Sequence, residues 1–124
     1  MYLSDNLHQT KEIISSWNGT YKRKTIVFYP KDLKELKFLL TRLKKKKKTY
    51  IIRTGTCAYD SKSIAPNENT YVVSLKFLNK IIKIELKKKK LLVECGAKIS
   101  DIVKYLKNKN FSLFSVPGGE NISI

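Results

Sequence analysis

The chain has 124 residues, which suits a single domain, and it carries 26 basic against 10 acidic residues. No run of about 18 apolar residues indicates a transmembrane helix. The start, MYLSDNLHQTKEII, lacks the basic head and apolar stretch of a signal peptide. Its two cysteines, Cys57 and Cys95, form neither a disulfide framework nor a metal-ligand spacing, so a reducing, cytoplasmic location is expected.

The formal net charge of +16 raises nucleic-acid binding as a possible class of function. Base recognition and bidentate phosphate contacts favour arginine. The chain has 23 lysines but only three arginines, Arg23, Arg42 and Arg53. Lysine, isoleucine, asparagine and tyrosine are all abundant, and AT-rich codons specify all four. A Lys-rich module that binds nucleic acid or an anionic surface is therefore kept as an alternative, motivated by the lysine clusters at 44–48 and 87–90.

The first part of the chain predicts an arm, a strand and a helix. Residues 1–24 are polar with scattered apolar positions and are expected to form a short helix and then an irregular arm. TIVFYP at 25–30 is a β-branched and aromatic run closed by proline, typical of a strand. Leucines at 33, 36, 40 and 43 lie on one helical face, and the lysines at 44–48 suit the negative end of that helix.

The second part predicts mainly strands. Segments 49–55 and 70–75 each read as a strand, and 79–86 with 91–96 read as a hairpin whose lysine tip blunts unwanted pairing. A helix follows over 99–106, where Ile99, Ile102, Val103 and Leu106 share a face, and then a last strand over 111–116. The predicted fold class is α+β, a small mixed sheet with two flanking helices.

Three side chains receive structural interpretations. Alternation along the strand at 91–96 favours Cys95 over Glu94 as the core member. Trp17 is interpreted as a packing anchor for the N-terminal arm, and Tyr105 as lying at the edge of the buried face of the second helix.

The long polar connection between strands 49–55 and 70–75 is the candidate functional segment. Gly55 allows a sharp turn and close approach of the backbone to a ligand. Residues 54–58, Thr-Gly-Thr-Cys-Ala, are small, so successive N–H groups could form a concave anion site for a diphosphate. Taken alone, one glycine in a polar loop is more often a structural turn, and neither the P-loop nor the dinucleotide glycine spacing is present.

Four motifs in order strengthen the functional interpretation: IIRTGTCAYDS, LNKI, VECGAKISDIVKYL and FSVPGG. This layout resembles the FAD-binding domain of the vanillyl-alcohol oxidase and p-cresol methylhydroxylase (PCMH) type, over about residues 17–124, with 1–16 as an N-terminal arm. SWNGTYKRKTIVFYP and YDS are most similar to the decaprenylphosphoryl-β-D-ribose 2′-oxidase branch, and aldonolactone oxidases are a second possibility.

The resemblance implies how FAD would be held. Backbone amides in the loop would cradle the pyrophosphate, and the later turn would approach the diphosphate and adenosine; the residues concerned are Arg53, Thr54, Gly55, Thr56, Cys57, Ala58 and Tyr59, then Pro117, Gly118, Gly119 and Ser123. No histidine stands in the loop, so the resemblance implies non-covalent FAD, with Cys57 as a small packing residue.

The resemblance also implies a reaction. FAD would accept a hydride from a hydroxyl-bearing carbon of a small molecule, a sugar or a lipid-linked sugar, while the protein positions the cofactor. The family pattern continues beyond Ile124, so the chain is expected to be an N-terminal portion, truncated at its C-terminus and not catalytic alone. Thr54 and Thr56 stand where glycine is common, and a glycine before Asp60 is missing, so a degenerate member without FAD is a further alternative.

Overall fold

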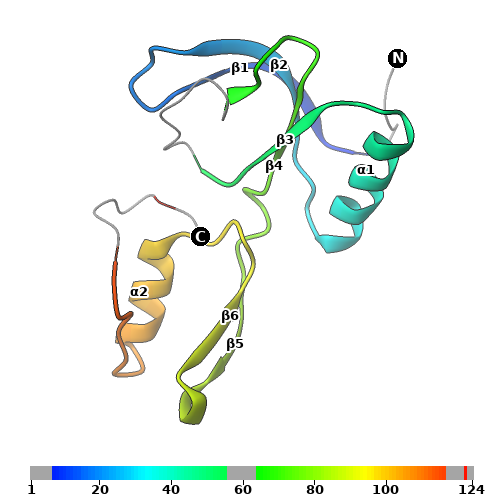
Figure 1. Cartoon of the computed structure of the whole chain (residues 1–124). Coiled ribbons are helices and arrows are strands. Elements are labelled where there is room, and N and C mark those ends of the chain that lie inside the picture. Colours follow the sequence, from blue (N-terminus) through cyan, green and yellow to red (C-terminus); the bar gives the residue numbers. More distant parts are fainter. Residues whose placement is uncertain (1–6, 56–63, 117–121, 123–124) are drawn as a thin grey trace.

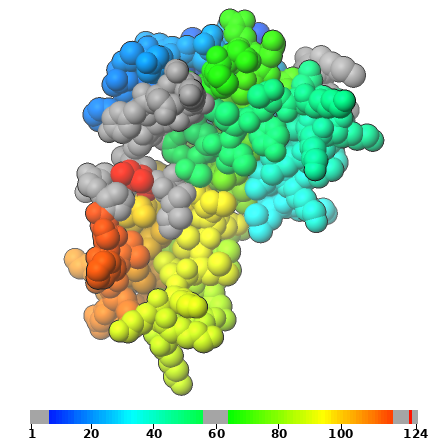
Figure 2. Space-filling view, viewed as in Figure 1, coloured from blue at the N-terminus to red at the C-terminus, as the bar shows by residue number. Residues whose placement is uncertain are grey.

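A computed structural model describes residues 7–55, 64–116 and 122, which form two lobes (Figure 1). The elements are β1 (Gln9–Ser15), β2 (Lys22–Phe28), α1 (Leu33–Lys45), β3 (Tyr50–Arg53), β4 (Tyr71–Ser74), β5 (Ile81–Glu85), the short 3-10 turn η2 (Leu86–Lys88), β6 (Lys90–Val93) and α2 (Ile99–Lys107). β1 to β4 and α1 build the upper lobe, and β5, β6 and α2 build the lower lobe, which Figure 2 shows set off below it. The predicted α+β class with two helices is confirmed.

The upper lobe contains a four-stranded mixed sheet in the order β1-β2-β4-β3. β2, β4 and β3 run parallel, with Val72 of β4 opposite both Val27 of β2 and Ile51 of β3, whereas β1 pairs antiparallel with β2. The carboxyl ends of the three parallel strands therefore meet at one edge of the sheet. We call this edge, where Tyr29, Thr54 and Leu75 follow the strands, the carboxyl edge.

Helix α1 covers one face of this sheet. Leu39 and Leu43 are fully buried and pack in one cluster with Phe28 of β2, Val73 of β4 and Leu78. The helix begins at the N-cap Asp32, whose side chain accepts a hydrogen bond from the Glu35 amide at 2.8 Å. The predicted helix is confirmed, and its buried stripe is centred on Leu39 and Leu43.

The turn after α1 is a Schellman motif. The Lys47 amide donates to the Lys44 carbonyl and the Lys48 amide donates to the Leu43 carbonyl, at 3.0 and 2.9 Å. Lys47 has a φ of 49°, the left-handed conformation in which glycine is most at ease. The lysine cluster at 44–48 therefore closes the helix and directs the chain into β3.

The opposite face of the sheet is covered by the end of the long connection. Ile64 and Ala65, exposed by only 1% and 2%, pack with Ile14, Val27 and Val72. Burial on both faces is what parallel strands rich in valine and isoleucine require.

The lower lobe is a hairpin packed against a helix. Ile102 and Leu106 of α2 lie against Ile84 of β5 and Leu91 of β6, with Tyr105 partly buried at the border of this cluster, as predicted. The expected lysine tip is also confirmed, although Lys90 already belongs to β6. Salt bridges join Glu85 to Lys83 and Lys88 at this tip.

Gly96 lies where the two lobes join. Its amide donates a hydrogen bond to the Leu78 carbonyl at 2.7 Å. A Cβ atom at this position would stand 2.0 Å from the Leu75 carbonyl oxygen and 2.8 Å from that of Leu78. Only glycine therefore permits the two backbone segments of the junction to approach this closely.

Two secondary-structure predictions are wrong. Residues 9–15 form β1 and not the expected helix or irregular arm, because pairing with β2 satisfies their backbone and buries Ile14. Residues 111–116 contain no strand, since no partner strand among the described residues pairs with them. Phe111 and Leu113 pack on the lower-lobe core, whereas Phe114 is completely exposed.

Two side-chain predictions are also wrong. Cys95 is exposed, because β6 ends at Val93 and the alternation of the strand does not continue through Cys95. The Glu94 carboxylate instead accepts a hydrogen bond from the Lys80 amide at 2.8 Å, and Ala97 occupies the core position. Trp17 is 63% exposed, so it is not a buried anchor.

None of the helices in residues 7–55 and 64–116 is long and apolar enough to cross a membrane.

Candidate cofactor-binding site

The predicted loop begins at the carboxyl edge of the parallel strands. Arg53 is the last residue of β3, and Thr54 and Gly55 follow it, all three partly buried. The Leu75 amide donates to the Arg53 carbonyl at 2.9 Å, which ties the end of β3 to the end of β4. Ligands of α/β sheets bind at this kind of edge. Thr56, Cys57, Ala58, Tyr59, Pro117, Gly118, Gly119 and Ser123, the remaining predicted site residues, lie outside the described residues.

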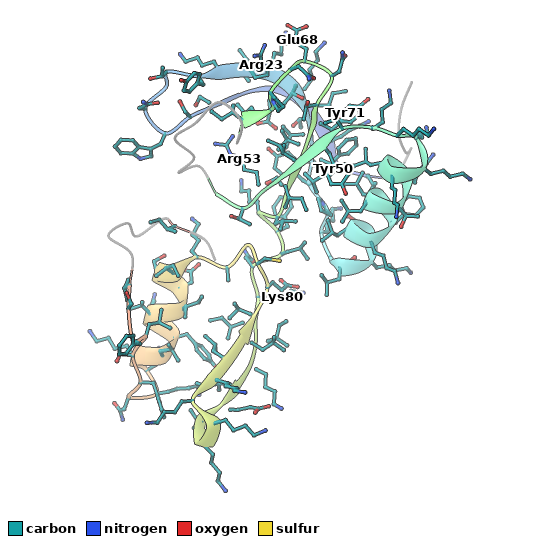
Figure 3. The ribbon with its side chains drawn as sticks, in the orientation of Figure 1. Arg23, Tyr50, Arg53, Glu68, Tyr71 and Lys80 are labelled. Atoms are coloured by element: carbon teal, nitrogen blue, oxygen red, sulfur yellow. The ribbon has the colours of Figure 1, made fainter. Side chains whose placement is uncertain are left out.

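The Arg53 side chain fastens the entrance of the loop. Its Nε donates to the Gly55 carbonyl and its Nη2 donates to the Ser15 carbonyl, each at 2.9 Å. Figure 3 shows Arg53 at the end of β3, on the side of the upper lobe that faces the lower lobe. The resemblance had assigned only the backbone of Arg53 to the site. The structure adds a guanidinium that holds Gly55 against the end of β1.

A second polar group near this edge was not predicted. The Glu12 carboxylate of β1 accepts hydrogen bonds from the Thr10 hydroxyl and, at 2.6 Å, from the Tyr29 hydroxyl. The two hydrogen bonds, from Thr10 first and then Tyr29, lower the pKa of Glu12, and the positive charges of Lys76 and Arg53 act in the same direction. Residues 9–15 were expected to lie outside the sheet, so no pattern in the sequence predicted Glu12 at this position.

Tyr29 lies between this carboxylate and an aromatic group. Burial and the bond to Glu12 raise the pKa of Tyr29 to about 12. The ring makes edge contacts with His8 at 5.4 Å and a tilted contact with Phe77 at 5.9 Å between centroids. The Lys76 ammonium lies 5.8 Å from the Phe77 ring centroid. Hydrogen bonding and ring packing thus fix the residue that follows β2.

Replacing Tyr29 by phenylalanine should change the alkaline stability of the protein. The raised pKa means that the Tyr29 hydroxyl stabilises the fold below pH 10, and that this contribution is lost as the pH rises through about 12. The variant should be less stable by about 1 kcal/mol at neutral pH and should lose less stability between pH 10 and about 12. Thermal unfolding of both proteins across this range tests it, and parallel alkaline curves would contradict it.

The end of the described chain meets the start of α2. The Ile99 amide, at the first residue of α2, donates to the Ile122 carbonyl at 2.9 Å. In the sequence Glu120 and Asn121 separate Ile122 from the predicted Pro-Gly-Gly turn, so the hydrogen bond holds the chain just after this turn at the N-terminus of α2.

The described groups suit a diphosphate in position and in charge. Gly55 opens a loop of small residues at the carboxyl edge, and Arg53 and Lys76 supply positive charge beside it. Among the described residues no cluster of histidine, cysteine, aspartate and glutamate could hold a metal ion. The positive charges of Arg53 and Lys76 favour an anionic ligand at this edge.

The sheet places the predicted loop at its carboxyl edge, the position at which α/β sheets bind nucleotide cofactors. The model of the FAD binding domain family matches residues 25–123, and the chain belongs to this family. The cofactor of the domain is FAD. A nucleic-acid module or a family member without FAD is not favoured by this membership.

Solved structures share the fold at low identity. A variant of cholesterol oxidase from Brevibacterium sterolicum is 16% identical to this chain, with a TM-score of 0.86. The match covers 97% of this chain and 24% of the cholesterol oxidase chain. A solvent-stable cholesterol oxidase is 13% identical, with a TM-score of 0.84, and the match covers 98% of this chain and 24% of the oxidase. An alkyldihydroxyacetonephosphate synthase is 17% identical, with a TM-score of 0.72, and the match covers 85% of this chain and 22% of the synthase.

These matches confirm the PCMH-type FAD-binding fold. The chain spans about a quarter of the length of the solved structures it matches. No curated protein matches the chain.

Proposed function

We propose that this chain is the FAD-binding portion of a flavin-dependent oxidoreductase and that the loop after β3 holds the FAD diphosphate. The observation that carries the proposal is the pair of hydrogen bonds from Arg53, which fix the loop entrance at the carboxyl edge of a domain that belongs to the FAD family. Arg53, Thr54 and Gly55 would begin the cradle, and residues 56–59 would complete it.

Pro117, Gly118, Gly119 and Ser123 would approach the diphosphate and adenosine from the start of α2. The hydrogen bond between Ile99 and Ile122 supports this placement because it holds the chain after the turn at the N-terminus of α2. The absence of histidine from residues 53–63 supports non-covalent FAD.

The bound flavin would accept a hydride from a carbon that bears a hydroxyl group. The name of cholesterol oxidase states that this structural neighbour oxidises cholesterol, which supports oxidation of a small molecule. We propose a sugar or a lipid-linked sugar as the substrate, following the resemblance of SWNGTYKRKTIVFYP and YDS to the decaprenylphosphoryl-β-D-ribose oxidase branch. The cytoplasmic location stays a prediction.

The first experiment is reconstitution of the full-length protein with FAD, followed by gel filtration. The expected result is flavin absorbance that co-elutes with the protein and is released by acid precipitation, as non-covalent binding requires. A colourless protein peak would contradict FAD binding. A yellow precipitate that keeps its flavin after acid treatment would contradict non-covalent attachment alone.

A further inference from the structure

A basic cleft lies away from the cofactor loop, at the end of the sheet where β3 and β4 begin. It has a volume of about 710 Å³ and is lined by Lys11, Lys24, Thr25, Ile26, Lys47, Lys48, Thr49, Glu68, Asn69 and Tyr71. Figure 3 shows Glu68 and Tyr71 toward the top of the upper lobe, whereas Arg53 lies on the side facing the lower lobe. The cleft is therefore separate from the site at the carboxyl edge.

Four lysines from separate segments converge on this cleft. Lys11 comes from β1, Lys24 from β2, and Lys47 and Lys48 from the connection between α1 and β3. Glu68 is the one carboxylate of the lining residues. None of the four lysines forms an ion pair with a residue that the structure describes. Among the described residues, no salt bridge offsets their mutual repulsion, whereas Lys83 and Lys88 share Glu85.

The rest of the lining suits a compact ligand. Its volume falls in the range of small-molecule sites, about 300–1,000 Å³. Ile26 and Tyr71 are partly buried and give the cleft an apolar surface, while Thr49 and Asn69 add uncharged polar groups. Lysine binds phosphate as a point charge and needs no planar geometry, so four ammonium groups around a concave site suit a group with several phosphate oxygens.

We propose that this cleft binds a compact phosphate-bearing anion, independently of FAD. The phosphate group can belong to a free small molecule or to a lipid headgroup, because the same ammonium groups would recognise either.

Lys47 allows an unusually clean test. Its φ of 49° suits glycine, so Lys47→Gly removes one cleft charge while relieving backbone strain. Lys89 is a matched control because it also has a left-handed φ, 51°, but lies at the β5–β6 tip. Both substitutions lower the net charge by one, so they differ in the place from which the charge is lost.

The probes are inorganic tripolyphosphate, titrated by calorimetry, and phosphatidylcholine vesicles with and without phosphatidic acid, tested by co-sedimentation. Lys47→Gly should weaken binding about fivefold, because two unit charges at contact distance in water attract each other by about 1 kcal/mol. The double variant with Lys47→Gly and Lys24→Ala should weaken binding about twenty-five-fold. Lys89→Gly should leave binding unchanged, and all variants should keep the thermal midpoint and FAD binding of the parent protein.

The two probes separate the sources of the phosphate. An effect of Lys47→Gly on tripolyphosphate supports a free ligand, and an effect on acidic vesicles alone supports a lipid headgroup. Equal losses from Lys47→Gly and Lys89→Gly would show unspecific charge attraction and overturn the proposal. If the protein binds neither tripolyphosphate nor the acidic vesicles, the proposal is overturned as well.

Discussion

Replacement of Gly96 by alanine is expected to lower the free energy of unfolding by about 3 kcal/mol or more. The new Cβ would stand 2.0 Å from the Leu75 carbonyl oxygen, and the atoms it meets are backbone that no rotamer change can move aside. Relief would require separating the segments that hold the two lobes together, including the 2.7 Å hydrogen bond from Gly96 to Leu78. Urea unfolding followed by circular dichroism measures the loss.

Gly19→Ala is the matched control for this substitution. Gly19 has a φ of +71°, and a Cβ there would meet no atom within 4 Å. The control should cost about 1 kcal/mol, the price of a left-handed conformation alone. Similar losses for both variants would show that the close approach at Gly96 has no special role.

Replacement of Arg53 by alanine is expected to weaken FAD binding by about 10- to 100-fold. The substitution removes both hydrogen bonds that hold the loop entrance, to Gly55 and to Ser15, and bonds from a charged donor contribute about 1.5–3 kcal/mol. It also removes positive charge from the side of the proposed diphosphate. Titration of the protein with FAD, followed by flavin fluorescence, measures the change.

Arg42→Ala controls for the loss of one positive charge from the same lobe, since Arg42 lies in the last turn of α1, where its guanidinium stacks over the Phe38 ring. It should leave FAD affinity nearly unchanged. Arg53→Lys should restore the charge but only part of the affinity, because an ammonium group lacks the fork that reaches two carbonyls. Full affinity in Arg53→Ala would contradict the role of this side chain at the site.

Most of the fold follows from local patterns in the sequence. The leucine spacing predicted the helix α1, and the short apolar runs predicted β2 and the two strands around the lysine tip. β1 was missed because its stability comes from its partner: of its residues only Ile14 is buried, and the register with β2 decides its conformation. The segment 111–116 shows the reverse case, since its strand-like composition meets no partner strand among the described residues.

The candidate site could be predicted only as a place in the chain. Gly55 and the small residues after it indicated a turn beside an anion, and β3 does end there. The side-chain contacts of Arg53 and Glu12 depend on how β1 returns along the sheet, a relation between residues 38 positions apart for Arg53 and Ser15. Local sequence patterns do not encode contacts between distant residues, so only the structure reveals the hydrogen bonds of Arg53 and of Glu12.

The central position of β4 has a consequence for how the molecule is assembled. β2 and β3 are joined through α1, yet they are not neighbours, because β4 lies between them and pairs with both. During synthesis the parallel sheet therefore stays open until residue 74 has left the ribosome, and non-local closure of this kind is slow. The loop between β3 and β4 has both ends anchored only at that moment, so the proposed FAD site can form only after this central strand has been inserted.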